Sequence, residues 1–102
     1  MSSEYGGINC IGHQQLTVST AAVGLTMPTS TRPRHAILQV LSNPVRMRSG
    51  GTDPTATAGI ELVAGTLLHM MEPAMDYFAL IIGMEFIREG GADGIVEAEF
   101  YT

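Results

Sequence analysis

Histidine and cysteine are the residues of this sequence that could bind a metal ion or supply a nucleophile and its base. The three histidines, His13, His35 and His69, lie far apart, and none has a second ligand at the close spacing of paired zinc ligands. Cys10 and His13 are near neighbours, but no arginine lies nearby to make the thiol reactive. The sequence therefore predicts no metal site and no nucleophilic centre.

Carboxylates and glycine-rich loops could also carry chemistry. Glu97 and Glu99 would share one face of a strand, which is equally the arrangement of an ordinary solvent-facing strand. The loop acids lack the spacing of a calcium loop, and the paired glycines lack the Lys and Ser or Thr that follow in a phosphate loop; these residues are Asp53, Asp76, Asp93, Gly50–Gly51 and Gly90–Gly91. We expect no enzyme activity and no cofactor.

Charged residues are distributed unevenly along the chain. Four arginines fall in one stretch, whereas most acidic residues lie from Glu61 onward, which predicts a basic edge and an acidic edge. Either these edges pair within one molecule, or the basic edge of one copy meets the acidic edge of the next. The residues expected to make subunit or partner contacts are Arg32, Arg34, Arg46, Arg48, Asp53, Glu97 and Glu99.

The composition favours a protein that contacts other proteins. Charged residues make up 15% of the 102 residues, below the usual quarter or so, and all basic residues are arginine, which is common in interfacial ion pairs. A formal net charge of -5 argues against nucleic-acid binding. No segment reaches the about 20 apolar residues of a membrane span, so no membrane partner is expected. The lone Cys10 cannot form an intrachain disulfide, as is typical of cytosolic proteins.

Short alternating segments separated by Gly- or Pro-rich turns predict an all-β fold. We expect a compact antiparallel β-sandwich or small barrel of six to seven short strands. The expected strands cover residues 16–20, 35–41, 45–48, 58–62, 67–71, 77–88 and 95–101, with a turn or short strand over 22–25. Proline-rich loops separate them at residues 27–33, 42–44 and 49–54.

Two parts of the chain are harder to assign. Residues 77–88 fit a helix or a strand, because Met75, Phe78 and Ile82 have helical spacing while β-branched and aromatic residues are dense; we favour a strand. Residues 1–15 contain little to bury and are expected to form a flexible N-terminal arm before a domain over residues 16–102.

Residues 45–59 and 86–88 resemble a family of small structural proteins of tailed bacteriophages. The most specific part is the Arg-x-Arg…Gly-Thr-x-Pro-Thr-Ala-x-x-Gly block that runs from Arg46 to Gly59, and the similarity covers about His35 to Tyr101. In that family the block lies between two strands and has no catalytic role. Where the family usually has an aromatic between the arginines, this chain has Met47, followed after Arg48 by Ser49.

The resemblance implies a non-enzymatic virion protein that is made in the host cytoplasm. It would decorate or cement the capsid and contact itself and the major capsid or other virion proteins. One alternative is a head–tail connector or tail component. Another is a soluble domain that binds a small ligand or a carbohydrate, although the chain has no Trp and three Tyr. A small barrel enzyme is a further alternative, without a convergent set of titratable groups to support it.

Overall fold

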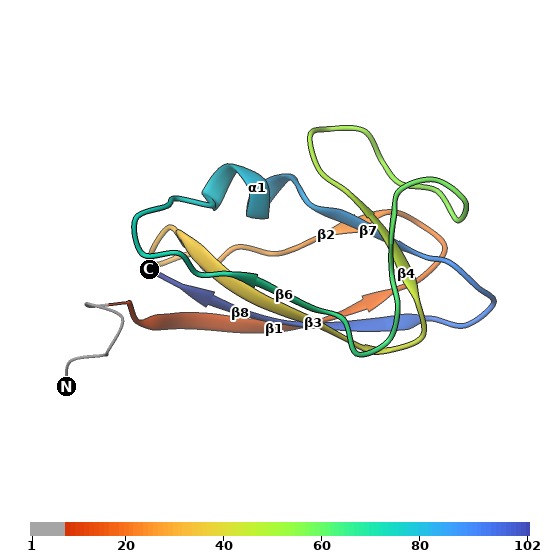
Figure 1. Ribbon diagram of the computed structural model, residues 1–102, viewed down its shortest axis with the longest axis horizontal. Coiled ribbons are helices and arrows are strands. Elements are labelled where there is room, and N and C mark those ends of the chain that lie inside the picture. Colours follow the sequence, from red (N-terminus) through yellow and green to blue (C-terminus); the bar gives the residue numbers. More distant parts are fainter. Residues whose placement is uncertain (1–7) are drawn as a thin grey trace.

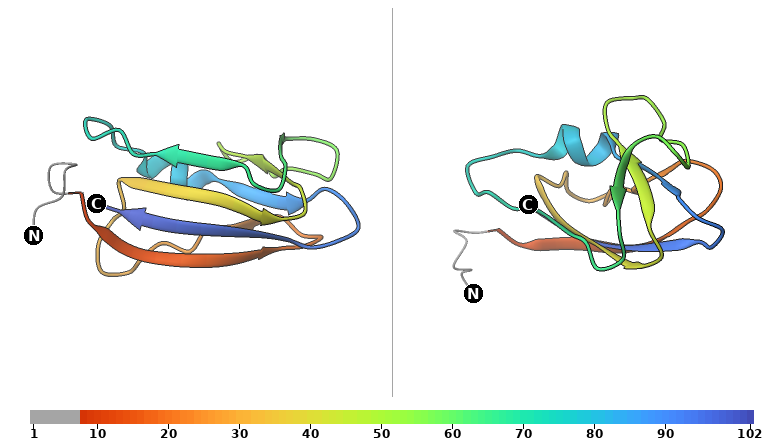
Figure 2. Two further views of the ribbon diagram at one scale, coloured as in Figure 1. Left: turned by 60° about the horizontal axis from the view of Figure 1, so that its bottom comes forward. Right: turned by 45° about the vertical axis from the view of Figure 1, so that its right-hand side comes forward.

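The computed structural model describes residues 8–102 and shows two four-stranded antiparallel sheets packed as a sandwich, with one short helix (Figure 1). The predicted all-β antiparallel sandwich is confirmed, with eight strands in place of the six or seven expected. We call the layers sheet A, with strand order β1-β8-β3-β6, and sheet B, with strand order β2-β7-β4-β5. Figure 2 shows how the short strands of sheet B lie over only part of sheet A.

Sheet A forms the long layer. Its side chains alternate between core and solvent because successive residues of a strand face opposite sides of the sheet. Leu38, Ala98 and Phe100 are at most 1% exposed, whereas Gln39 and Glu99 are exposed. The strands are β1 (Cys10–Val18), β8 (Gly94–Tyr101), β3 (His35–Ser42) and β6 (Leu67–Met70).

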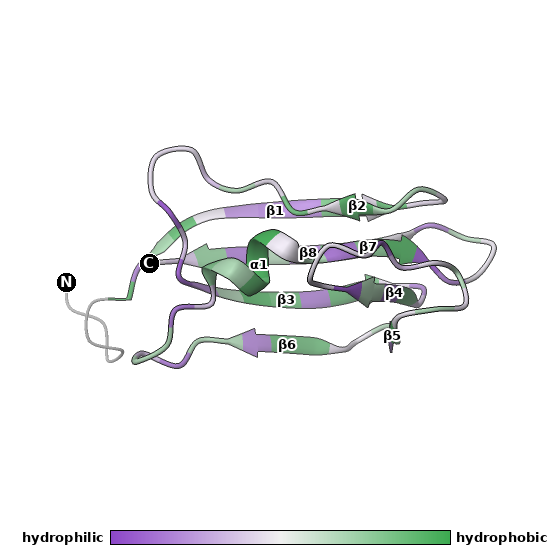
Figure 3. Ribbon diagram, turned by 90° about the horizontal axis from the view of Figure 1, so that it is seen from above, coloured by the Kyte–Doolittle hydropathy of each residue, from purple (hydrophilic) through white to green (hydrophobic). Residues whose placement is uncertain are grey.

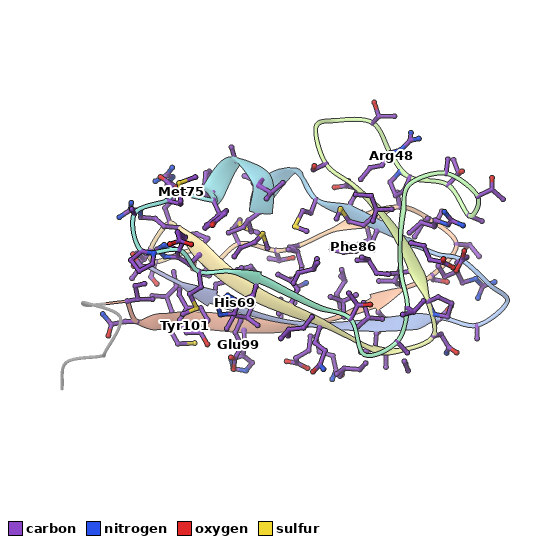
Figure 4. The ribbon with its side chains drawn as sticks, in the orientation of Figure 1. Arg48, His69, Met75, Phe86, Glu99 and Tyr101 are labelled. Carbon is purple, nitrogen blue, oxygen red and sulfur yellow. The ribbon has the colours of Figure 1, made fainter. Side chains whose placement is uncertain are left out.

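Sheet B forms the short layer, and its inward side chains complete the core. Val45, Met47 and Phe86 are between 0% and 8% exposed, and Figure 4 shows Phe86 between the two layers. A tight turn separates β3 from β4, where Asn43 has a φ of 59°, a left-handed conformation that Asn tolerates. The strands are β2 (Val23–Gly24), β7 (Glu85–Arg88), β4 (Val45–Arg48) and β5 (Ile60–Leu62).

The helix α1 (Phe78–Gly83) covers the part of sheet A that sheet B does not reach (Figure 1). The prediction of one strand over residues 77–88 is therefore wrong for its first half, although residues 85–88 do form β7. Local hydrogen bonding favours the helix, since Asp76 Oδ1 accepts a bond of 3.0 Å from the Phe78 amide at the helix start. No helix in the described residues is long and apolar enough to cross a membrane.

The expected N-terminal arm needs correction at residues 10–15, which belong to β1. All of β1 pairs with β8, and Asn9 exchanges backbone hydrogen bonds of 3.2 and 3.0 Å with Thr102 before the strand begins. The sequence pattern did not predict this half of the strand, because polar residues occupy both of its faces, namely His13, Gln14 and Gln15. Gln14 points inward, where its Oε1 accepts a bond of 2.9 Å from the Thr26 amide. Residues 1–7 of the expected arm lie outside the described residues.

The predicted loop after β4 is confirmed and connects β4 to β5. Thr55 and Ala58 exchange two backbone hydrogen bonds of 2.9 and 3.2 Å at its tip, and Pro54 is buried against the sheet. Gly59 has a φ of +126°, and a Cβ there would lie 3.2 Å from Pro54 Cβ and 3.1 Å from the Met47 carbonyl oxygen. Glycine is required at this position for both reasons.

Adjacent isoleucines in α1 provide a test of how the helix packs. Ile81 is fully buried, whereas Ile82 is 52% exposed. We expect Ile81→Ala to lower the free energy of unfolding by about 2–5 kcal/mol through cavity formation. Ile82→Ala removes the same atoms and should change it by less than about 0.5 kcal/mol. Urea denaturation measures both, and equal losses would contradict the packing of α1 on sheet A.

Candidate contact surfaces

Arg46 lies on the outer face of sheet B, where two contacts within the chain hold it. Its Nη2 atom donates to Glu89 Oε2 at 2.7 Å, and its Nη1 atom donates to the Gly59 carbonyl oxygen at 3.1 Å. Glu61 lies opposite Arg46 in the β4–β5 ladder. Arg46 therefore fastens β4 to the residue that follows β7 and to the residue that precedes β5.

The two carboxyl groups beside Arg46 differ in their affinity for protons. The hydrogen bond between the two side chains and the negative charge of Glu89 raise the pKa of Glu61. The same hydrogen bond, followed by the hydrogen bond and charge of Arg46, lowers the pKa of Glu89. Glu61 is therefore the first of the pair to be protonated as the pH falls, and Glu89 stays ionised beside Arg46.

Arg32 and Arg34 meet Asp76 just before α1. Arg32 Nη2 and Arg34 Nε lie 2.9 and 3.9 Å from Asp76 Oδ2, and the Arg32 guanidinium carbon is 4.4 Å from the centre of the Phe78 ring. The hydrogen bond from the Phe78 amide, with a smaller effect from Arg32, lowers the pKa of Asp76. This cluster ties the segment before β3 to the start of α1.

Glu97 and Glu99 lie on the outer face of sheet A. Glu97 Oε1 accepts a hydrogen bond of 3.1 Å from Gln15 Nε2, and Glu99 Oε1 accepts one of 2.8 Å from the Tyr101 hydroxyl. Figure 4 shows Glu99 on the opposite side of the sandwich from Arg48. The acidic strand and the arginines of β4 therefore face away from each other.

The predicted contact residues thus do not form one basic edge and one acidic edge. Arg32, Arg34 and Arg46 pair with acidic residues of the same chain, which was one of the two predicted alternatives. Arg48 and Asp53 form no ion pair with another described residue. For Arg48, Asp53 and the outward glutamates of β8, contact with other proteins stays a prediction.

The histidines occupy three different strands of sheet A. His13 and His69 are exposed on β1 and β6, which are the two edge strands. His35 is 2% exposed; its Nε2 lies 3.0 Å from the Glu72 carbonyl oxygen, and its ring packs edge-on against Tyr77. In the described part of the chain, no three His, Cys, Asp or Glu side chains are placed to hold a metal ion together.

A cleft of about 440 Å³ opens between β1 and the segment between β2 and β3. Residues 11–14 line one side and residues 26–30 the other, and His13 is the one ionisable residue in this lining. The Cys10 Sγ beside the cleft donates to the Gly12 carbonyl oxygen at 3.7 Å. The cleft therefore offers polar and apolar contacts for a ligand but no acid–base pair.

Large apolar side chains are exposed around the helix, in a group that we call the α1 patch. Leu80 and Ile82 are 40% and 52% exposed on α1, and Met75 before the helix is 51% exposed. Figure 4 shows Met75 beside α1. The patch exists because a helix that buries Ile81 against the sheet must turn its other apolar residues towards solvent.

A second group, which we call the β6 patch, lies where the chain passes from β5 to β6. Backbone hydrogen bonds from Gly65 to Val40 and from Val40 to Thr66, of 2.6 and 2.9 Å, hold this passage against the end of β3. The patch comprises Leu41, Ile60, Val63 and Leu67, which are 46%, 61%, 56% and 56% exposed. Sequence patterns did not identify either patch, because its residues have the apolar character of core residues.

Comparison with protein-family models, with curated proteins and with solved structures finds no match to this chain. Function must therefore be inferred from the surfaces described above. Two of them are apolar patches, one is a small cleft, and the ion pairs of the arginines serve the fold itself.

The Asp76 cluster should make stability depend on pH. Because the pKa of Asp76 is lowered by folding, its carboxylate stabilises the protein above the ordinary pKa of aspartate, and this stabilisation is lost as the pH falls through the lowered value. We expect Asp76→Asn to be less stable than wild type at neutral pH, and the two proteins to converge in acid. Urea denaturation over a pH series measures this. Asp53→Asn, at an exposed position without an ion pair to a described residue, is the matched control, and a pH-independent loss in Asp76→Asn would contradict the charge effect.

Arg46 should control the proton affinity of Glu89. In an NMR titration of the carboxyl carbons, we expect Glu61 to titrate above Glu89, and Arg46→Gln to raise the pKa of Glu89. Arg48→Gln changes the neighbouring arginine of the same strand and should leave Glu89 unchanged. Titration of Glu89 above Glu61 in the wild type would show that the hydrogen bonding of this group is different.

Proposed function

We propose that the protein is a non-enzymatic structural component of a tailed-phage virion, which decorates or cements the capsid shell. The observation that carries this proposal is the exposure of seven large apolar side chains, three in and just before α1 and four near the passage from β5 to β6. Single exposed apolar residues are normal, whereas groups of them mark contact surfaces. Its partners would be further copies of itself and the major capsid or other virion proteins, met after synthesis in the host cytoplasm.

Charge supports a docking role of this kind. Charged residues are few, and Arg32, Arg46 and Arg88 are each held by an acidic residue of the same chain at 2.7–2.9 Å. Contacts with other proteins would therefore depend on apolar burial and backbone complementarity more than on charge steering. Such contacts suit a protein that is added in many copies to a preformed shell.

The residues that resemble phage structural proteins have structural tasks in this fold. The block from Arg46 to Gly59 comprises the last three residues of β4 and the loop between β4 and β5; Arg46 donates a hydrogen bond to the Gly59 carbonyl oxygen, and Pro54 packs beside Gly59. A loop between two strands without a catalytic group is what the resemblance implies. This agreement supports a structural role over a catalytic one.

A head–tail connector or a tail component would use the same kinds of surface. The two locations differ in copy number and in position on the particle, so microscopy separates them.

The cleft beside β1 favours a second candidate, a domain that binds a small ligand. Its volume of about 440 Å³ suits a small molecule, and Gln14, Thr26 and Ser30 supply polar groups near Phe100. The chain has no Trp, which weighs against a carbohydrate surface. A rise in melting temperature with monosaccharides or small carboxylic acids would favour this candidate.

Particles assembled from the genome that encodes the chain provide the test. We expect the protein to sediment with gradient-purified virions in many copies, and gold-labelled antibody to mark the head. Labelling at the junction or tail would favour the alternative location. Recovery of the protein free of particles would overturn the proposal.

Variants on the surface make this test specific. Leu67→Lys places a charge in the β6 patch and should reduce the occupancy of particles by about tenfold or more. Thr57→Lys adds the same charge at the exposed tip of the β4–β5 loop and should leave occupancy unchanged. Equal occupancy of both variants would exclude the β6 patch as the docking surface.

A further inference from the structure

One edge of β1 pairs with no other strand of the described chain, and residues 26–30 lie beside its first half across the cleft. The strand lies at the end of sheet A and pairs with β8 along its other edge. With nine residues it offers about 30 Å of backbone. No backbone group of the described residues outside β8 hydrogen-bonds the backbone of β1; the Thr26 amide donates to the inward Gln14 side chain at 2.9 Å, and Cys10 Sγ donates to the Gly12 carbonyl oxygen at 3.7 Å within the strand.

The unpaired edge also lacks the usual protection against strand pairing. Natural edge strands are kept apart by charges, prolines or short length. The sequence has no Asp, Glu, Lys or Arg between Glu4 and Arg32, and β1 contains no proline. The other edge strands differ, since β2, β5 and β6 have two, three and four residues, and β5 carries Glu61.

We propose that β1 pairs in antiparallel fashion with β1 of a second copy, so that sheet A continues across a symmetric dimer. This rests on the self-association included in the proposed function. Pairing is regular from Gly12 to Val18, after the register shift that follows Cys10, so the two-fold axis falls at the midpoint, Gln15. Gln15 then meets Gln15 of the partner subunit, and His13 meets Thr17 of the partner subunit.

A symmetric dimer favours a strand that carries no charge near the two-fold axis. A two-fold axis brings each residue near its own equivalent, so a charged residue close to the axis would face a like charge. The outward side chains of β1 near the axis, His13, Gln15 and Thr17, include no acidic residue and no Lys or Arg. Antiparallel strands also place these side chains in direct cross-strand pairs. The nearest carboxylate, Glu97, lies one strand further from the axis on β8 and accepts a hydrogen bond of 3.1 Å from Gln15 Nε2 of its own chain.

The shape of the molecule adds contact area to such a dimer. Figure 3 shows the segment between β2 and β3 extending beyond β1 on the side where β1 begins. A two-fold axis at Gln15 directs this segment of each copy towards the opposite half of the partner's β1. In such a dimer, residues 26–30 of each copy lie next to the second half of the partner's β1.

A charge at the axis provides the first test. Gln15→Glu, at an exposed position opposite Glu97 on β8, sets two like charges a few ångströms apart with no cation beside them and should raise the dimer dissociation constant about tenfold or more. His69→Glu adds the same charge on the other edge strand of sheet A and should leave the constant unchanged. Sedimentation velocity over a concentration series measures both, with circular dichroism to confirm folding. A wild-type chain that stays monomeric, or equal effects of the two variants, would overturn the proposal.

Cross-linking at the axis provides the second test. In a Cys10→Ser background, Gln15→Cys should form an intersubunit disulfide under mild oxidation, since residues opposite each other across an antiparallel pair lie within disulfide range. Thr17→Cys and Leu67→Cys should form little, because neither faces its own equivalent across the axis. Faster cross-linking of Leu67→Cys than of Gln15→Cys would place the interface at β6 and overturn the proposal.

Salt dependence separates this interface from one made of ion pairs. The dimer should persist when NaCl is raised from about 0.05 to about 0.5 M, because its paired strands are uncharged. Dissociation over this range would contradict the pairing. All of these measurements use the purified chain without particles, so a chain that dimerises through β1 but never joins a virion would contradict the proposed function alone.

Discussion

The inner face of sheet A must be covered along its whole length, and the strands of sheet B are too short to do it. An exposed apolar sheet face would cost the hydrophobic free energy that holds a domain of this size together. The helix α1 meets this constraint by burying Ile81 in the core, and Met84 directly after the helix is buried there as well. The contacts of Asp76 with Arg32, Arg34 and the Phe78 amide hold the helix start in place.

The same constraint explains where apolar side chains reach the surface. A helix of six residues can bury little more than one face, so Leu80 and Ile82 remain exposed while Ile81 is buried. The crossing from sheet B to sheet A leaves Val63 and Leu67 exposed in a similar way. The exposed apolar patches are therefore consequences of two layers of unequal length.

Charges in this protein serve the fold more than recognition. Arg46 joins the end of β7 to the start of β5 through Glu89 and Gly59, and Arg88 pairs with Asp93 across the loop that leads from β7 in sheet B to β8 in sheet A. None of these pairs involves β1, which contains no Asp, Glu, Lys or Arg. An uncharged strand edge is suited to backbone pairing, which is directional and insensitive to salt.

The alternation of apolar and polar residues in the sequence was enough to predict the strands that have one apolar face and one polar face. In β8, Val96, Ala98 and Phe100 alternate with Glu97 and Glu99, so the class, the inward face and the approximate ends could be read directly. The positions of the turns could be predicted equally well, since Gly and Pro affect the conformation of the backbone locally. These features need no knowledge of distant residues.

Three features depended on the tertiary structure: the strand conformation of the first half of β1, the helical conformation of α1, and which charged residues pair. The polar residues of β1 became a strand because β8 supplied hydrogen bonds and Gln14 found the Thr26 amide, and residues 78–83 became a helix because sheet B ended short of them. Likewise, Arg46 and Glu89 meet through strands far apart in the chain. Such choices depend on which surfaces remain to be covered once the sheets have formed, and no local pattern contains that information.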